Sequence, residues 1–474
     1  MIIMNKEIRT LLIQPSYKDW SRKLPLSLAY LAAVLEKEKK FVRVWDLCTD
    51  EVSDEELTKF IKENRINLVG LTSTTPVIFS VWRLAKIIKD FDKGIKIVLG
   101  GPHPSALPGE SLKNDFIDFV IIGEGEKTLS ELIFSLEKKS NFNKIPGLAY
   151  KDNGAIKFNP PRKLITNLDE IPFPARHLFP FPQKYTSPGQ YYKYFADILT
   201  SRGCPFSCTF CANKAVFGKN FRARSPENIL EEIIFLNKNY GIKEIHISDD
   251  NFTLDKERAK KICELIVKNK LKIKWACGNG IHAGTIDEEL VKYMKKSGCY
   301  RIGIGIESGN PMVLSRLGKQ ITLEQVEKVV NLFKKYKIIT VGFFMFGNIG
   351  ENEKTMNDTI NFAKKLSLDY AQFFILIPFP GTPVFNYLKQ GGYLLSEDWW
   401  DYRDFNNPVF KTEALNKDLL LKMYSKSYKE FYLRPSYVFK RIFRAFSNYY
   451  EFKITLNGLL EISSRIFRKE QSSS

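Results

Sequence analysis

The sequence predicts an α/β protein with two parallel sheets in succession and a small helical region at the end. Residues 1–140 alternate five short apolar strand patterns with helical patterns, which indicates a doubly wound parallel sheet. Residues 195–400 repeat the alternation six times, which indicates an open (β/α)6 sheet, a partial barrel with fewer than eight strands. Residues 141–194 are expected to link the two domains, and residues 401–474 to form the helical region.

The first domain is expected to contain five short apolar strands between turn signals. They cover Arg9–Ile13, Phe41–Trp45, Asn67–Leu71, Ile95–Leu99 and Phe116–Ile122. The helical patterns are Leu26–Glu38, Ser53–Glu63, Phe79–Phe91, Ser105–Asn114 and Lys127–Lys138. Ligands of such sheets bind beyond the carboxyl ends of the strands, so the loops there are candidate binding residues.

Small and polar residues occupy these carboxyl ends: Ser73, Thr74, Gly100, Gly101, His103, Gly123 and Glu124. Glycines and small hydroxyl side chains let a bulky ligand approach the backbone. A nucleotide is one candidate ligand, but no G-x-G-x-x-G follows the first strand, which weakens that interpretation. His103 either approaches the ligand or is a turn residue between two prolines, and the second interpretation is slightly favoured.

The linker is expected to be ordered. A hairpin is predicted around Asn153-Gly154, because this dipeptide favours a tight turn. Six prolines follow with aromatic residues between them, which is typical of a packed strap rather than of a disordered tail.

The second domain is expected to contain six strands, Ala196–Thr200, Glu244–Ser248, Lys272–Cys277, Arg301–Ile306, Ile338–Phe346 and Ala371–Ile377. The helical patterns between them are Pro226–Asn239, Asp255–Asn269, Asp287–Lys296, Thr322–Tyr336 and Glu353–Leu366. The first helix has clear end signals, with Ser225 as N-cap, Pro226 at the first turn and Gly241 after the last.

Three cysteines lie in one loop after the first strand of this domain. Cys204, Cys208 and Cys211 have the spacing C-x3-C-x2-C, with the aromatic Phe210 before the last of them. Three thiolates on a short loop indicate a soft metal or an iron–sulfur cluster. A structural zinc site is normally closed by four ligands, so zinc would need a distant fourth ligand such as His246 or His282. A four-iron cluster with three protein ligands instead leaves one iron open.

Composition adds the compartment and a charge. The seven cysteines are an odd number, no secretory signal is recognised, and no apolar run is long enough to span a bilayer. These features favour a reducing cytoplasm with thiols used as ligands. The net charge of +19 calls for an acidic partner, which could be nucleic acid, an anionic membrane or an anionic ligand.

The end of the chain is predicted to form a basic amphipathic helix. Phe439, Ile442, Phe443, Phe446 and Tyr450 fall at helical spacing, with Lys440, Arg441 and Arg444 between them. Such a helix could bind an anionic membrane peripherally, in which case binding should be sensitive to salt. A packing helix with a solvated face is equally compatible with the pattern.

The cysteine loop, Ser201-Arg-Gly-Cys-Pro-Phe-Ser-Cys-Thr-Phe-Cys211, resembles the signature of the radical S-adenosylmethionine (SAM) enzymes. The first domain resembles the cobalamin-binding domain, Rossmann-like in form, that precedes the radical SAM domain in a large family. Residues 25–32, the Ser73 loop and Gly100-Gly101-Pro102-His103 carry this second resemblance. The family includes radical SAM methyltransferases and enzymes of the anaerobic magnesium-protoporphyrin ester cyclase type.

The resemblance implies three cofactors: a 4Fe-4S cluster, SAM and cobalamin. It implies that Asp249 and Asp250 hold the amino group of SAM, and that Glu307, followed by Ser308, accepts the ribose hydroxyls. Arg222 and Arg224 are candidates for the SAM carboxylate, or form a solvated basic patch. The D-x-H-x-x-G loop that supplies a cobalt ligand in some cobalamin domains is absent, so no histidine ligand from that loop is expected.

The implied activity is methylation of an unactivated carbon of a small-molecule or lipid substrate. A radical cyclisation or ring rearrangement is an alternative within the same family. A transfer-RNA methylthiotransferase would need a second three-cysteine cluster in the first domain, which has only Cys48, so nucleic acid is not expected as a partner. A non-catalytic cobalamin sensor is disfavoured by the cluster loop. The resemblance also implies an electron donor such as flavodoxin or ferredoxin.

Overall fold

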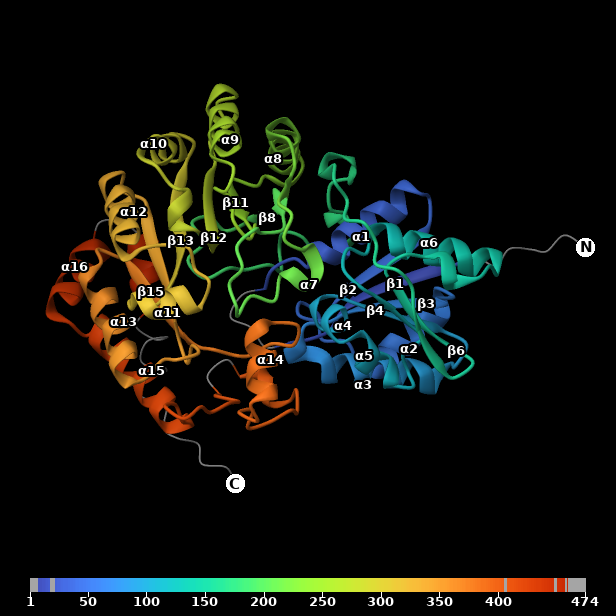
Figure 1. Cartoon of the computed structure of the whole chain (residues 1–474). Helices are drawn as coiled ribbons and strands as arrows, with labels where there is room; N and C mark the ends of the chain where they lie inside the picture. Colours follow the sequence, from blue (N-terminus) through green and yellow to red (C-terminus); the bar gives the residue numbers. More distant parts are fainter. Residues whose placement is uncertain (1–6, 18–21, 405–406, 447–449, 457, 459–474) are drawn as a thin grey trace, which may run out of the picture.

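Two α/β domains lie side by side in the computed structural model, which describes residues 7–17, 22–404, 407–446, 450–456 and 458 (Figure 1). The first contains a seven-stranded sheet, and the second contains an open sheet of six parallel strands. The fold class predicted from the sequence is confirmed, including the helical C-terminal part.

The N-terminal sheet has the strand order β2-β1-β3-β4-β5-β6-β7. Its first five strands are parallel, and the hairpin β6–β7 adds antiparallel to β5. The hairpin expected in the linker therefore continues this sheet. The strands are β1 (Arg9–Gln14), β2 (Phe41–Asp46), β3 (Leu68–Thr72), β4 (Lys96–Gly100), β5 (Phe119–Ile121), β6 (Leu148–Asp152) and β7 (Ala155–Phe158).

Helices cover both faces of this sheet because alternate strand residues point to opposite faces. Leu12 belongs to the apolar core that includes α1 and α6, whereas its neighbours Leu11 and Ile13 belong to the core that includes α2 and α3. The helices are α1 (Leu26–Lys37), α2 (Asp54–Glu63), α3 (Ile78–Phe91), α4 (Pro102–Ala106), α5 (Pro108–Lys113) and α6 (Glu126–Lys138).

The helix expected over Ser105–Asn114 is two short helices, α4 and α5. Leu107 between them has φ −130° and ψ 59°, outside the helical region. Pro108 explains the break, since a proline disfavours helical geometry in the residue before it and cannot donate a backbone hydrogen bond.

The barrel-like sheet has the order β15-β14-β13-β12-β11-β8, and all of its strand pairs are parallel. A small antiparallel ribbon, β9 with β10, stands beside it and was not expected from the sequence. The strands are β8 (Ala196–Ile198), β9 (Ser201–Arg202), β10 (Arg222–Ala223), β11 (Glu244–Ile247), β12 (Lys274–Ile281), β13 (Cys299–Glu307), β14 (Ile339–Phe346) and β15 (Tyr370–Ile375).

The helices of the second domain begin and end largely where the sequence indicates. Ser225 caps α8 by accepting a hydrogen bond from the Asn228 N–H, Pro226 is its first residue, and Gly241 ends it in the left-handed conformation, as predicted. The helices are α7 (Lys214–Phe217), α8 (Pro226–Tyr240), α9 (Lys256–Lys268), α10 (Glu288–Lys296), α11 (Pro311–Arg316), α12 (Leu323–Lys335), α13 (Glu353–Lys365) and α14 (Pro383–Gln390).

Helix α15 (Lys417–Tyr432) covers the free edge of the six-stranded sheet. The hydroxyl oxygens of Tyr432 and Tyr428 accept hydrogen bonds from the backbone N–H groups of Ala371 and Phe373 in β15, at 3.1 and 3.2 Å. These contacts satisfy backbone groups that an edge strand would otherwise expose.

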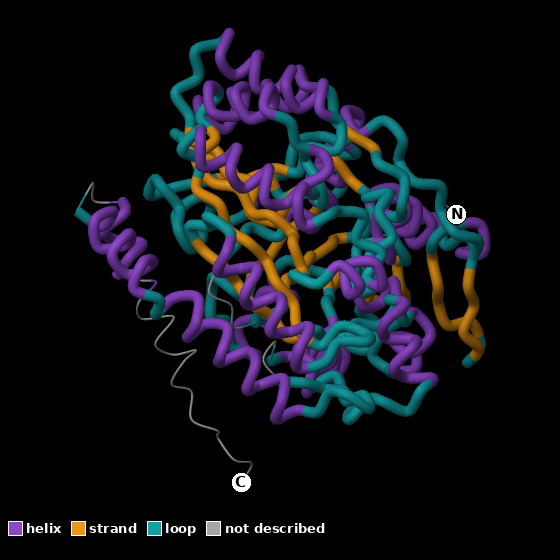
Figure 2. Tube along the Cα trace, turned by 60° about the vertical axis from the view of Figure 1, so that its left-hand side comes forward, coloured by secondary structure: helices purple, strands orange, loops and turns teal. Residues whose placement is uncertain are grey.

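Helix α16 (Pro435–Ala445) follows α15 at the outer edge of the molecule (Figure 2). None of the helices in the described part of the chain combines the length and apolarity that crossing a bilayer requires.

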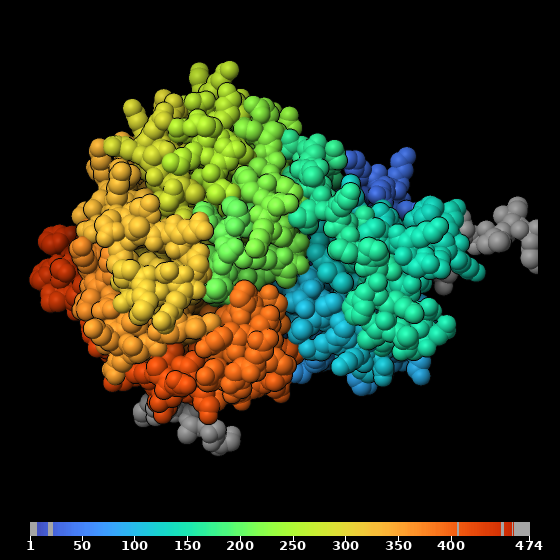
Figure 3. All heavy atoms as spheres, in the orientation of Figure 1, coloured from blue at the N-terminus to red at the C-terminus, as the bar shows by residue number. Residues whose placement is uncertain are grey.

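The two domains share apolar cores. Trp399, Tyr402 and Val409 belong to the same core as α2, α3 and the strands of the first sheet. Figure 3 shows the orange part of the chain that includes α14 against the blue N-terminal part. The aromatic residues near 400 therefore pack between the domains, in agreement with the core role that aromatic clusters usually have.

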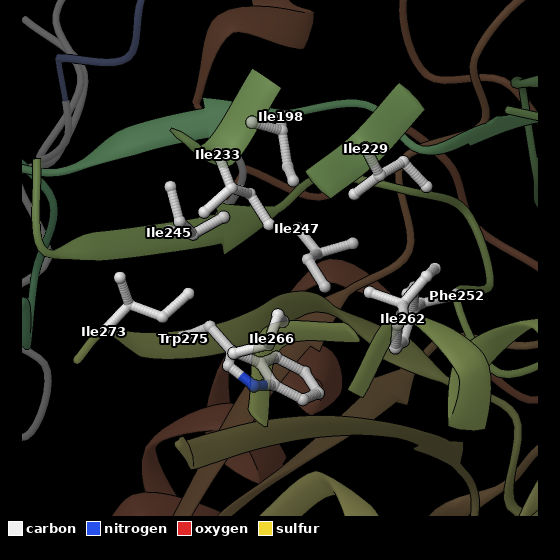
Figure 4. Close-up of a pocket in the computed structure, with 10 residues that line it drawn as sticks. All are labelled: Ile198, Ile229, Ile233, Ile245, Ile247, Phe252, Ile262, Ile266, Ile273 and Trp275. Carbon is white, nitrogen blue, oxygen red and sulfur yellow. The ribbon is translucent and has the colours of Figure 1, made fainter. Parts of the chain in front are cut away.

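A small void lies inside the second domain, between β8, β11 and β12 and the helices α8 and α9. It has a volume of about 10 Å³ and is lined by ten side chains, eight of them isoleucine (Figure 4). An apolar void of this size is a packing defect of the core rather than a ligand site.

Candidate functional site

The three cysteines lie on the loop between β9 and α7, at the carboxyl end of the six-stranded sheet. All three thiols are free and partly buried. Burial raises the pKa of Cys204, Cys208 and Cys211, and Lys319 opposes this effect at Cys208. Phe210 packs against the apolar core and fixes the loop beside Cys211.

Three other segments hold the cysteine loop in place. The Thr209 N–H donates to the Leu317 carbonyl at 3.0 Å, and the Thr209 carbonyl accepts from the Val384 N–H at 3.2 Å. The Phe206 ring stacks on His282 with ring centres 3.9 Å apart. The loop is therefore positioned before any cluster binds, which suits a group whose ligands must meet a fixed geometry.

The zinc alternative finds no support in these positions. His246 hydrogen-bonds Glu244 at 2.8 Å inside β11, and His282 accepts from the Gly284 N–H at 3.2 Å through Nδ1. Within the described residues, no three side chains of His, Cys, Asp or Glu are arranged to hold a single metal ion. A four-iron cluster takes one thiolate per iron, and the free cysteine loop fits it chemically.

Glu307 and Lys319 form an ion pair next to the cysteines. The Glu307 Oε1 atom lies 2.9 Å from Lys319 Nζ, and both side chains are about nine-tenths buried. Glu307, Cys208 and Cys204 all raise the pKa of Lys319, so Lys319 interacts electrostatically with the cysteine loop as well as with Glu307. Glu307 is predictable from the sequence, whereas Lys319 is not, since a glycine–lysine step in a loop gives no signal of its own.

Ser308 does not face the site. Its hydroxyl lies 3.1 Å from the Thr359 hydroxyl of α13, and the residue is fully buried. This side chain connects the end of β13 to α13, and its contact with the cofactor stays a prediction.

The two neighbouring aspartates have different roles. Asp249 is fully buried and accepts hydrogen bonds from the Thr200 N–H, the Thr200 hydroxyl and the Ser201 hydroxyl, so it fixes the end of β8. Its expected contact with SAM stays a prediction.

Asp250 is the aspartate that remains available. Its Oδ1 accepts from Asn213 at 2.5 Å, while its buried Oδ2 has no hydrogen-bond partner among the described residues. Burial, with the nearby Asp249 charge, raises the pKa of Asp250 to about 6. Asp250 also acts electrostatically on Cys204 and Cys211, so its free oxygen lies near the cysteine loop.

Arg222 and Arg224 are buried in ion pairs rather than free for a ligand or solvated. Arg224 pairs with Glu232 of α8 and donates to the Leu199 carbonyl at 3.1 Å. Arg222 pairs with Glu124 of the first domain at 2.8 Å. Both guanidinium groups already have carboxylate partners, and a contact of either arginine with the SAM carboxylate stays a prediction.

The loops after β3 and β4 form an open cradle. The Ser73 N–H donates to the Gly100 carbonyl at 2.9 Å, and the Ser73 carbonyl accepts from the His103 N–H at 3.2 Å. A Cβ atom at Gly101 would lie 2.7 Å from the Ser73 carbonyl oxygen, and Gly101 has φ +103°, so only glycine fits. At Gly100 a Cβ atom would meet no other atom within 4 Å. Together with the exposed Thr74, this gives a large ligand access to the backbone.

His103 is a packing residue. It is 1% exposed, its Nδ1 lies 3.1 Å from the Thr75 hydroxyl, and its ring packs edge-on against Trp399. Burial lowers the pKa of His103 to about 4, so the ring is neutral. These contacts favour the structural interpretation over a direct approach to the cofactor.

Gly123 and Glu124 face the second domain. A Cβ atom at Gly123 would lie 3.5 Å from the Val216 carbonyl of α7. The Glu124 carboxylate accepts from Arg202, Arg222 and the Ile165 N–H, so it has no free oxygen for a ligand. Glu124 therefore connects the two domains, and its contact with the cofactor stays a prediction.

Known proteins share both domains. Residues 198–363 match the model of the radical SAM superfamily, and residues 22–133 match the B12 binding domain. An uncharacterized methyltransferase of Pyrococcus horikoshii is 38% identical over 439 residues, covering 92% of this chain and 94% of the relative.

Two further relatives have named reactions. Anaerobic magnesium-protoporphyrin IX monomethyl ester cyclase of Rubrivivax gelatinosus is 26% identical, covering 91% of this chain and 78% of the relative. Cytidylyl-2-hydroxyethylphosphonate methyltransferase of Streptomyces wedmorensis is 28% identical, covering 82% of this chain and 83% of the relative.

Solved structures share the fold. The methyltransferase TsrM from Kitasatospora setae, with cobalamin and a [4Fe-4S] cluster bound, has a TM-score of 0.69 at 22% identity, covering 81% of this chain and 75% of TsrM. The cobalamin-dependent SAM radical enzyme OxsB has a TM-score of 0.74 at 19% identity, covering 97% of this chain and 72% of OxsB. The chain thus belongs to the cobalamin-dependent radical SAM enzymes, whose cofactors are a 4Fe-4S cluster, SAM and cobalamin.

Proposed function

We propose that this enzyme transfers a methyl group to an unactivated carbon atom of a small-molecule or lipid substrate. The observation that carries the proposal is the close approach of the two strand-end surfaces. Gly123 lies against the α7 backbone, and a Cβ atom at Gly381 would lie 3.0 Å from Ala106 of α4. A cobalamin on the N-terminal strand ends would therefore lie beside the cysteine loop. Two of the relatives above are named as methyltransferases, which supports the same activity.

The residues of the site have separable tasks in this proposal. When bound, the cluster with SAM supplies a 5′-deoxyadenosyl radical, and cobalamin supplies the methyl group. Cys204, Cys208 and Cys211 hold the cluster. Asp250 offers its unpartnered oxygen to the amino group of SAM, which can donate the missing hydrogen bond. Glu307 lies near Cys208, where its carboxylate accepts from the ribose hydroxyls while Lys319 balances its charge.

An isotope experiment tests the reaction type. The anaerobically reconstituted enzyme, with a donor such as flavodoxin or ferredoxin, is incubated with host lipid and metabolite extracts and SAM that carries a trideuteromethyl group. Methylation predicts a product that gains this whole group, or all but one of its deuterium atoms if the methyl carbon exchanges one hydrogen. Cyclisation, the reaction named for the Rubrivivax relative, predicts a product without deuterium that has lost two hydrogen atoms. The second result would replace the proposed activity.

Helix α16 supports a reaction at a lipid surface. The support comes from its exposed apolar side chains and not from the basic side chains that the sequence pattern suggested. Lys440 and Arg444 pair with Asp369, and Arg441 pairs with Glu451, so these cations face the protein. The outward face is apolar instead: the exposed fractions are 65% for Phe439, 49% for Ile442, 76% for Phe443 and 84% for Phe446. Tyr450 is not on that face, because its hydroxyl donates to the Gly189 carbonyl at 3.0 Å.

We propose that this apolar face inserts into the surface of an anionic bilayer, which the net charge of +19 attracts. Binding should depend less on salt than a free basic helix would, because three of its cations are already paired. The variant Phe439→Ser/Phe443→Ser should lose sedimentation with phosphatidylglycerol vesicles, whereas Phe134→Ser, which removes an exposed phenylalanine from α6, should not. Equal binding by both variants, or dimer formation lost in the first variant alone, would contradict the lipid assignment. The predicted tail beyond residue 458 lies outside the described residues.

A further inference from the structure

A buried ion cluster joins the two domains at the base of the cysteine loop. Glu124 Oε1 lies 3.0 Å from Arg202 Nη1 and 2.8 Å from Arg222 Nη1, and Glu126 Oε1 lies 2.6 Å from Arg202 Nη2. No side chain of the four is more than 8% exposed. Two cations and two anions balance each other, so the cluster carries no net charge into the interior.

The hydrogen bonds around this ion cluster leave it little freedom. The second oxygen of Glu124 accepts from the Ile165 N–H at 2.9 Å, and Arg222 also donates to the carbonyl groups of Ile165 and Phe217. Charged partners with fixed directions determine a relative position more narrowly than apolar contacts do, since each bond has a preferred length and angle.

The ion cluster is close in sequence to both expected cofactor sites, the cysteine loop and the carboxyl ends of the N-terminal strands. Arg202 in β9 is two residues before Cys204, and Arg222 in β10 pairs with it across the ribbon that closes the cysteine loop. Gly203, between Arg202 and Cys204, has φ +82°, and a Cβ atom there would lie 2.3 Å from the Asn220 carbonyl oxygen. On the other side, Glu124 adjoins Gly123, at the carboxyl end of β5. A shift of either arginine would therefore move the cysteine loop relative to the N-terminal strand ends.

We infer that Glu124, Glu126, Arg202 and Arg222 are positioning residues. They fix the position of the cysteine loop relative to the carboxyl ends of the N-terminal strands, where cobalamin is expected to bind. In this role they would keep the methyl group of bound SAM within reach of bound cobalamin. Apolar contacts such as those of Trp399 already hold the domains together, so the ion cluster adds geometry rather than adhesion. The inference rests on the proposed methyl transfer, but not on which substrate is methylated.

Two reactions that need no substrate distinguish this role from a structural one. Reductive cleavage of SAM to 5′-deoxyadenosine uses the second domain alone. Methylation of cobalamin by SAM would use both domains: once a donor such as flavodoxin or ferredoxin has reduced cobalamin to Co(I), its two electrons would form the cobalt–carbon bond while the carbon–sulfur bond breaks, and S-adenosylhomocysteine would leave. If the two sites lose their relative position, methylation of cobalamin should slow, whereas reductive cleavage of SAM should not change.

The holoenzyme is compared with Glu126→Gln, which removes one charge at constant size, and with Arg202→Lys, which keeps the charge but cannot bridge two carboxylates. Cobalamin methylation should fall about tenfold to a hundredfold, as expected for a displacement of about 1 Å, while SAM cleavage and cobalamin affinity stay within about twofold. The matched control is Glu131→Gln in the same helix α6, whose partner Arg162 also donates to the Thr128 hydroxyl and the Pro146 carbonyl.

Pulsed electron paramagnetic resonance supplies a readout independent of turnover. The distance distribution between cob(II)alamin and the reduced cluster should broaden in Glu126→Gln and Arg202→Lys, and should remain narrow in Glu131→Gln. An unchanged distribution, or a parallel loss of both reactions, would overturn the inference. Failure of both variants to fold would assign the four residues a purely structural role and would overturn it as well.

Discussion

The carboxyl ends of the two sheets are built in opposite ways. The six-stranded sheet presents titratable side chains, namely the three cysteines, Asp250, Glu307, Lys319 and Glu351. The N-terminal sheet presents residues with little or no side chain, such as Gly100, Gly123 and Ser73. Side chains suit a cluster and a small charged cofactor, which need ligands and counter-charges. The lack of side chains suits a bulky cofactor, which needs room and backbone contact. The following predictions test this contrast.

The largest effect is expected for Cys208→Ala. Removing one of three thiolates should prevent assembly of the cluster and abolish cleavage of SAM. The control is Cys263→Ala in α9, where the thiol is buried, its pKa is raised to about 12 by burial, and its loss should cost only about 1 kcal/mol of packing. Iron and sulfide content and 5′-deoxyadenosine formation are measured anaerobically. Normal iron content in Cys208→Ala would show that the loop does not hold the cluster.

The neighbouring glycines of the first domain should respond differently to a side chain. Gly100→Leu has room at its Cβ, so the fold should survive, but the side chain should cost cobalamin binding about 1–3 kcal/mol, which raises Kd about fivefold to 150-fold. Gly101→Ala should instead lower the free energy of unfolding by about 1–3 kcal/mol, because φ +103° is strained for alanine. Equilibrium dialysis and urea unfolding separate the two. Wild-type cobalamin affinity in Gly100→Leu would place the cofactor elsewhere.

The ion pair of Glu307 and Lys319 should behave as a coupled unit. Lys319→Met leaves a buried carboxylate unpaired, so the apo protein should lose about 3 kcal/mol of stability. Adding Glu307→Gln should restore part of the loss, with a coupling energy of about 1–3 kcal/mol. Urea unfolding of the single and double variants completes the cycle. Additive losses would show that the two side chains act independently, and SAM affinity measured on the same proteins reports the effect on the site.

The last prediction concerns the pH dependence of stability. Burial raises the pKa of Glu351 from 4.5 to about 8, so the folded protein keeps a proton that the unfolded chain loses. Stability from this residue is therefore lost as the pH rises between about 4.5 and about 8, with a slope of at most about 1.4 kcal/mol per pH unit. Glu351→Gln should remove that contribution. The measurement is the free energy of unfolding of both proteins at pH 5, 6, 7 and 8, because the difference between them isolates Glu351. A difference that stays constant with pH would contradict the burial argument.

Local patterns sufficed for much of this molecule. The strand and helix periods predicted both sheets, because the side-chain alternation that buries a strand is written into consecutive residues. The cysteine spacing predicted the cluster loop for the same reason, since all three thiols belong to one short segment. Ser225, Pro226 and Gly241 likewise fixed the ends of α8 by local hydrogen bonding.

Long-range pairing of charges was decided by the tertiary structure alone. Arg222 and Glu124 are 98 residues apart, and Lys319 and Glu307 meet only because a loop returns to the strand ends. A charged residue has many potential partners of opposite sign, and a single sequence does not rank them. The same reason explains why the cations of α16 face inward. Lys440 and Arg444 both pair with Asp369, which lies far away in the sequence, directly before β15. The sequence therefore determined which cofactors this protein holds, and the packing of the two domains determined which side chains remain free to touch them.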